Sequence, residues 1–158
     1  MGLMAIGVVF VTRCLLVLLF LPFSALDKLL NFHAAVIQAQ TAVKSTRLAS
    51  GLIVLGLLTE IFMSAGVVTG VGDRLAAFIL GGYCMVTALL WKPFWKAPDF
   101  KFKGPSKGRE IFWDFLKNLA VAGGFFIVAF GTSAHSVAAF LKHPLSSTHP
   151  YSVWKPLV

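Results

Sequence analysis

The sequence is poor in charged residues and especially in acidic ones. Only 13% of its 158 residues are Asp, Glu, Lys or Arg, and just six of these are acidic. Hydrophobic residues make up 58% of the chain and the mean hydropathy is +0.83, values that exclude an ordinary soluble domain. The few charges are clustered between long apolar runs. This pattern is typical of membrane spans that are separated by polar loops.

Cysteine is also scarce, and the common catalytic motifs are missing. Cys14 and Cys84 lie inside apolar runs without a CxxC spacing, so we expect reduced packing residues there. The sequence has no HExxH pair and no Gly-rich phosphate loop, and therefore does not support a zinc protease or a P-loop enzyme. His33 falls at the cytoplasmic end of the bundle and His135 near the outer end, and this difference in depth argues against a shared haem. We expect no metal site, no encoded cofactor and no catalytic centre of the chain's own.

The apolar runs predict an all-α, integral membrane four-helix bundle that forms a single domain over residues 1–158. Between the spans, a polar segment without turn residues, 27–44, is interpreted as an interfacial helix. A basic loop covers 92–112, and an extramembrane tail covers 142–158. The pattern Gly66-x-x-x-Gly70 predicts a close approach by another helix. The four spans are expected at about 4–26, 47–70, 74–91 and 113–141.

The net charge of +8 is explained by topology rather than by nucleic-acid binding. With four spans, the loops lie on one face and both termini on the other. Ten of the fourteen basic residues fall on the loop side. The positive-inside rule therefore places the loops in the cytoplasm and both termini outside.

Two charged residues lie deep within predicted spans. At 1.5 Å per residue, Arg13 is about 14 Å below the outer face and Glu60 about 15 Å below it. The matching depths predict an intramembrane ion pair, which would reduce the cost of two lone charges. The pair can be purely structural. Alternatively, an unpaired Glu60 could act directly, as a group that exchanges protons.

Polar groups also gather at the cytoplasmic ends of the helices. Lys28, Lys117, Asn118 and Trp113 form a candidate site for a quinone or a lipid head group. Both lysines can instead snorkel to the head groups without any function, whereas the short amide of Asn118 cannot. The basic loop is a candidate docking surface for a partner, through Lys96, Lys101, Lys103, Lys107 and Arg109.

Several of these residues together resemble a known family. They are Arg13, Lys28 within FSALDKL, Glu60, and the element KNLA-x-x-GG at 117–124. In this combination, over nearly the whole length, the chain resembles the DoxX family of small four-helix membrane proteins. Asp27, where a small or apolar residue is expected, and the long basic insert 92–109 depart from that pattern.

The resemblance implies a membrane subunit associated with redox systems, such as thiosulfate:quinone oxidoreduction and assemblies that handle oxidative stress. We therefore expect a mainly structural or quinone-proximal subunit of a redox complex. Its partners would be membrane lipid and the other subunits, with a quinone or lipid bound. The expected location is the bacterial cytoplasmic (inner) membrane with periplasmic termini. A small proton-linked transporter that uses Glu60 and Arg13, and a stand-alone quinone oxidoreductase, are the alternatives.

Overall fold

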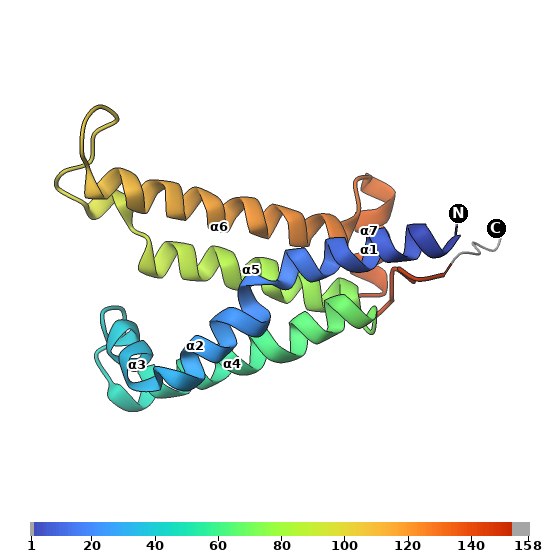
Figure 1. The fold of residues 1–158 in the computed structure, drawn as a ribbon, viewed down its shortest axis with the longest axis horizontal. Coiled ribbons are helices and arrows are strands. Elements are labelled where there is room, and N and C mark those ends of the chain that lie inside the picture. The colour runs from blue at the N-terminus through green and yellow to red at the C-terminus, as the bar shows by residue number, and fades with distance from the viewer. Residues whose placement is uncertain (1, 153–158) are drawn as a thin grey trace.

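The computed structural model describes residues 2–152, and within them the chain is helical without a strand. Figure 1 shows long helices running side by side, with the start of α1 and the segment after α7 at one end and the loop between α5 and α6 at the other. The helices are α1 (Gly2–Val17), α2 (Ala25–Leu30), α3 (Phe32–Gln40), α4 (Thr46–Thr69), α5 (Asp73–Trp91), α6 (Lys107–Phe130) and α7 (Ala134–Lys142).

Four helical segments are long and apolar enough to cross a membrane, which fits a multi-pass membrane protein. They are Gly2–Leu30, Thr46–Thr69, Asp73–Lys96 and Lys107–Phe130. Large apolar side chains such as Leu15, Leu55, Phe62 and Ile127 are exposed on these segments, as side chains that face lipid would be. The first three of these segments overlap the spans expected at 4–26, 47–70 and 74–91.

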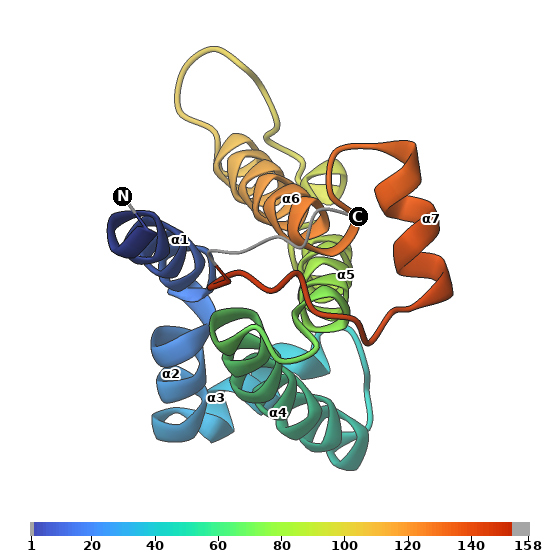
Figure 2. The ribbon, with the colours of Figure 1, turned by 90° about the vertical axis from the view of Figure 1, so that its right-hand side faces the viewer.

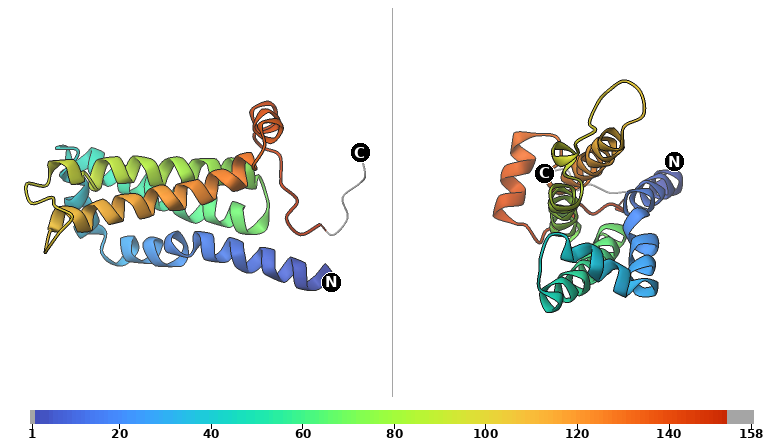
Figure 3. Two further views of the ribbon diagram at one scale, coloured as in Figure 1. Left: turned by 90° about the horizontal axis from the view of Figure 1, so that it is seen from above. Right: turned by 90° about the vertical axis from the view of Figure 1, so that its left-hand side faces the viewer.

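The predicted fourth span, 113–141, is wrong at both ends. Helix α6 already begins at Lys107, because the Ser106 side chain caps it by accepting a hydrogen bond from the backbone N–H of Arg109. It ends at Phe130, because Gly131 follows with φ of 72°, a conformation that favours glycine. The separate helix α7 then runs across the direction of the long helices (Figure 3).

The first segment is interrupted near its middle. A π-helical turn, Leu19–Ser24, joins α1 to α2, and within it Leu21 has the extended angles φ −125° and ψ 113°. Pro22 follows, and because proline has no backbone N–H it cannot donate the regular helical hydrogen bond. Helical structure nevertheless continues to Leu30, beyond the predicted end at residue 26. Ser24 and Lys28 are therefore held one helical turn apart, close to α4.

Helix α5 is central to the core, since it packs against both α4 and α6. Leu80, Val67 and Phe125, one from each of these helices, are completely buried. Gly81 allows the contact with α6, because a Cβ atom at this position would lie 2.6 Å from the ring of Phe126. Gly66 similarly allows close packing against Ala76 of α5, as its GxxxG pattern predicted.

The polar segment after the first span is helical, as predicted. It contains the end of α2 and all of α3, whose residues Val36 and Ala39 are buried against Ala49 of α4. A short turn then leads to Ser45, whose side chain caps α4. In Figure 1, α3 lies at the same end of the molecule as the α5–α6 loop.

Candidate functional site

A cavity of about 770 Å³ opens among α2, α3, α4 and α5, with Asn118 of α6 also on its wall. This volume is in the range of sites that hold a small organic ligand. Most of the wall is apolar, and a few polar groups are placed along it. The apolar lining includes Leu19, Phe20, Leu52, Ile53, Leu55, Ile79, Val86 and Leu90.

The polar part of the cavity is built around one oxygen atom, Oε1 of Glu60. Lys28 forms an ion pair with it, with 2.8 Å between Nζ and Oε1. Ser24 and Tyr83 each donate a hydroxyl hydrogen bond of 3.0 Å to the same oxygen. The Glu60 residue is only 1% exposed. A carboxylate this deep is tolerable because a cation and two hydroxyl groups satisfy it.

Local geometry explains how these four side chains meet. Lys28 and Ser24 are four residues apart on one face of the first segment, and Nζ of Lys28 donates a 2.6 Å hydrogen bond to Oγ of Ser24. On α4, Gly56 lies one turn before Glu60. A Cβ atom at Gly56 would be 3.0 Å from the hydroxyl oxygen of Tyr83, so this glycine leaves the space through which Tyr83 reaches the carboxylate.

Two cavity-lining residues also have polar atoms that are left without a hydrogen-bond partner. Over residues 2–152, Oε2 of Glu60 and Nε1 of Trp91 are buried and have no hydrogen-bond partner. Both residues line the cavity. Oε2 of Glu60 is a hydrogen-bond acceptor when the carboxylate is ionised, and the N–H at Nε1 of Trp91 is a donor. Unpaired buried polar atoms are costly, so a ligand that satisfied them would gain free energy.

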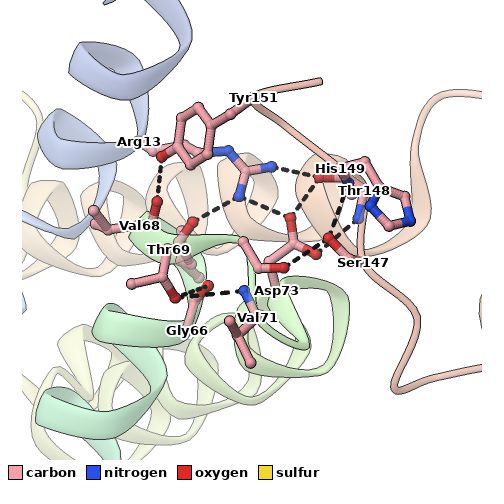
Figure 4. Close-up of polar contacts among 12 residues, drawn as sticks. Arg13, Gly66, Val68, Thr69, Val71, Asp73, Ser147, Thr148, His149 and Tyr151 are labelled. Atoms are coloured by element: carbon pink, nitrogen blue, oxygen red, sulfur yellow. Dashed lines mark hydrogen bonds and ion pairs between the residues drawn. The ribbon is translucent and has the colours of Figure 1, made fainter. Parts of the chain in front are cut away.

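A second buried polar cluster lies at the end of the molecule that carries the start of α1 and the segment after α7. Nη1 of Arg13 is 2.8 Å from Oδ2 of Asp73 and donates a 2.6 Å hydrogen bond to the carbonyl oxygen of Val67 (Figure 4). Thr148 completes the cluster, since it accepts from Nη2 of Arg13 and donates both its backbone N–H and its hydroxyl to Asp73. Asp73 is fully buried.

Residues 143–152 of the predicted tail therefore belong to the folded structure, which the sequence did not indicate, whereas its last residues, 153–158, lie outside the described part of the chain. Figure 2 shows residues 143–152 running from α7 across the ends of the long helices toward α1. Ser147 donates a 2.6 Å hydrogen bond to the carbonyl oxygen of Gly70, and the hydroxyl of Tyr151 donates to that of Val68. Gly70 itself ends α4 with φ of 82° and lies against Pro150, so the second glycine of the GxxxG pattern does not contact a helix.

The predicted ion pair between Arg13 and Glu60 is wrong. Each residue pairs with another partner, Arg13 with Asp73 and Glu60 with Lys28. Arg13 binds α4 at Val67, and seven residues of helix, about 10 Å, separate Val67 from Glu60. The depth estimate did not include Asp73 as a partner for Arg13, and it placed Lys28 at the cytoplasmic end of its helix rather than beside Glu60 on α4.

The structure divides the four residues predicted for the quinone or head-group site. Lys28 and Asn118 line the cavity, whereas Trp113 and Lys117 are not among its lining residues. Trp113 is 51% exposed, and exposed Lys117 forms an ion pair of 3.3 Å with Asp114 on its own helix. Asp27 does not pair with Lys28 but accepts a hydrogen bond from Asn31.

Sequence reasoning missed Ser24, Tyr83, Trp91, Asp73 and Thr148. Ser24 could have been found, because it precedes Lys28 by one helical turn. Asp73 could have been considered as a partner for Arg13, because a carboxylate is favoured in the first turn of a helix. Tyr83, Trp91 and Thr148 carry no comparable signal in the sequence.

Comparison with protein-family models, with curated proteins and with solved structures finds no significant match to this chain. The structure itself therefore defines the class of the protein: over residues 2–152 it is all-helical, with four apolar helical segments long enough to span a membrane.

Proposed function

We propose that the chain is a DoxX-like four-helix bundle of the bacterial cytoplasmic membrane, and that it acts as a quinone-proximal subunit of a membrane redox complex. The residues that carry the family resemblance support this proposal at two points. Lys28 and Glu60 form an ion pair on the cavity, and Asn118 of the KNLA-x-x-GG element lies on its wall. The other residue of the pattern, Arg13, has a separate place beside Asp73.

The cavity is the observation on which the proposal depends. A quinone has a flat apolar ring with carbonyl oxygens on opposite sides, so its site needs apolar walls and a few hydrogen-bond donors. The indole N–H of Trp91 is unused within the described chain, and the ammonium of Lys28 and the amide of Asn118 are further donors on the same wall. When bound, the quinone would supply the two-electron chemistry. The chain's own groups would bind and orient it.

Topology supports a cytoplasmic position for this cavity. The end of the molecule that carries α3 and the α5–α6 loop also carries most of the basic residues, whereas the start of α1 and the segment after α7 lie at the other end (Figure 1). The positive-inside rule then places α3 and the α5–α6 loop in the cytoplasm and the termini in the periplasm. Lys28, close to the turn between α2 and α3, lies nearer the cytoplasmic end.

A second candidate function is proton-linked transport, and one atom favours it. Oε2 of Glu60 is buried within the span without a partner among the described residues, and a carboxylate in that position can gain and lose a proton as a substrate passes. The two functions make different requirements. The redox subunit must hold a quinone and bind partner subunits, whereas a transporter must, as the isolated protein, carry a solute across a vesicle membrane.

The test is purification of the protein from its native membrane in mild detergent, with extraction and mass spectrometry of bound quinone and of co-migrating proteins. We expect about one quinone per chain and redox subunits in fixed proportion. Trp91→Phe, which keeps the ring packing but removes the N–H, should lower quinone content several-fold. Trp95→Phe is the matched control, because Trp95 is 52% exposed and does not line the cavity.

Lysine variants give an independent comparison within the same experiment. Lys28→Met should lose quinone, whereas Lys117→Met should retain it, because only Lys28 lines the cavity. Equal quinone content in the wild type, Trp91→Phe and Lys28→Met would refute a quinone in this cavity. A protein that is free of partners and of quinone, yet acidifies vesicles when given a solute gradient, would establish transport instead.

A further inference from the structure

The α5–α6 loop, together with the first residues of α6, concentrates positive charge, most of which forms no ion pair within residues 2–152. Segment 92–109 contains six basic residues and one acidic residue, Asp99. Lys92 pairs with Asp114, 3.0 Å away. The other five basic residues form no ion pair with any residue in 2–152. They are Lys96, Lys101, Lys103, Lys107 and Arg109, of which the four lysines are exposed.

The loop is folded into one defined arrangement around Ser106. The Ser106 residue is 5% exposed, and its hydroxyl accepts hydrogen bonds from the backbone N–H groups of Lys101 and Arg109 while donating to the carbonyl of Asp99. The Asp99 carboxylate accepts from the N–H groups of Lys107 at 2.6 Å and Gly108 at 3.0 Å. These backbone bonds, chiefly the one from Lys107, hold the pKa of Asp99 below its usual value.

Those contacts also settle which groups of the loop remain available to an anion. Asp99 and Ser106 already satisfy backbone N–H groups in the first turn of α6, so the N-terminus of this helix is not an open anion site. The ammonium groups of the exposed lysines remain. An anionic partner must therefore bind the lysine side chains.

Exposed aromatic rings lie among these lysines. Trp95 is 52% exposed, Phe102 68% and Trp113 51%. They belong to a connected aromatic cluster that includes Phe94 and Phe112, whose ring centroids are 5.0 Å apart. Aromatic side chains beside lysines are favoured at the boundary between head groups and acyl chains, where the ring is partly buried and the cation stays in water.

We propose that this loop binds the phosphate head groups of anionic phospholipids at the cytoplasmic surface. Clusters of four or more basic residues next to a span attract acidic lipids. The orientation of the chain in the membrane would by itself explain the positive charge of this loop. It would not explain why the loop has one fixed conformation or why aromatic rings are exposed on it. An acidic protein surface would match the lysines equally well, but it would not account for the exposed rings of Trp95, Phe102 and Trp113 beside them. Lipid is therefore the occupant that satisfies both features.

The experiment uses the full chain in neutral detergent, titrated with phosphatidylglycerol or with phosphatidylcholine, and native mass spectrometry counts the bound lipids. We expect preferential binding of phosphatidylglycerol, and binding that weakens as salt is raised. Lys101→Gln with Lys103→Gln should weaken phosphatidylglycerol binding at least about tenfold, with no change for phosphatidylcholine. Phe102→Ser should weaken both lipids, because it removes the apolar contact.

The matched control is Lys44→Gln with Arg47→Gln. These residues are also basic, exposed and near the α3–α4 turn at the same end of the molecule, but lie outside the loop. If the two double variants lose equal affinity, diffuse charge on this face rather than the loop attracts the lipid, and the proposal fails. It fails also if the wild type binds both lipids equally, and in that case binding of an acidic soluble subunit to the same lysines would identify a protein-docking surface. Unchanged thermal unfolding in phosphatidylcholine confirms that each variant is folded.

Discussion

Separate ion pairs for Arg13 and Glu60 lead to a quantitative prediction about Lys28. At 2.8 Å and an effective dielectric constant of about 20, the attraction between the charges of Lys28 and Glu60 is about 6 kcal/mol. Much of this is offset by the cost of burying both charges. We therefore expect a coupling free energy of about 2–3 kcal/mol between the two side chains.

The perturbations are Lys28→Met, Glu60→Gln and the double variant. Lys28→Met should destabilise the fold by about 3 kcal/mol, near the lower end for a broken buried pair, since Ser24 and Tyr83 still donate hydrogen bonds to the carboxylate. The double variant should then cost less than the sum of the single ones. Equilibrium unfolding in detergent micelles with increasing SDS measures all three free energies.

The same measurement on Arg13→Met and Glu60→Gln is the control. These residues share no partner, and Arg13 contacts α4 about 10 Å along the helix from Glu60, so their losses of stability should add to within about 0.5 kcal/mol. Additive losses for Lys28 and Glu60, or a coupling above about 1 kcal/mol for Arg13 and Glu60, would refute the pairing described here.

Two further predictions concern other parts of the molecule. Gly81→Ala should destabilise the fold by about 1–3 kcal/mol, because the new methyl group overlaps the ring of Phe126. Gly82→Ala should be neutral or slightly stabilising, because a Cβ atom there has nothing within 4 Å. SDS unfolding compares the two variants, and equal stability would contradict this packing. Because the pKa of Asp99 is lower in the folded protein, its contribution to loop order is present above an unfolded value of about 3.9 and is lost as pH falls through the folded pKa. Hydrogen exchange at Lys107 should show protection at neutral pH that declines in acid, and Asp99→Asn should remove that pH dependence; protection that is insensitive to both changes would count against the cap.

The sequence was sufficient to predict the class of the molecule but not its pairings. Apolar length identifies the spans, because a buried backbone in lipid must be helical and each run must be about 20 residues long. The end of the fourth span was missed since Leu119–Leu141 contains only a few polar residues, and the break depends on the conformation of Gly131. An earlier end could have been inferred from the Gly-Thr-Ser sequence that begins there.

The polar residues show the same limit at the level of the site. Arg13, Lys28 and Glu60 were identified because charge inside an apolar run is costly and rare. Depth along a helix, however, does not give the direction in which a side chain points or the bend at Leu21. Partners of Glu60 come from two other segments, 23 and 32–36 residues away, and only the packed structure brings them to the same oxygen.

The contact between Arg13 and Thr148 has a consequence for biosynthesis. The two residues are 135 positions apart, so the ribosome makes the hydroxyl partner long after it has made the guanidinium. The apolar segment that carries Arg13 is therefore made long before this cluster can be completed. The closing step, in which Thr148 joins Arg13 to Asp73, occurs only after all the spans have been made. Formation of this cluster therefore distinguishes a chain in which Thr148 has been made from one in which only the four apolar segments have been made.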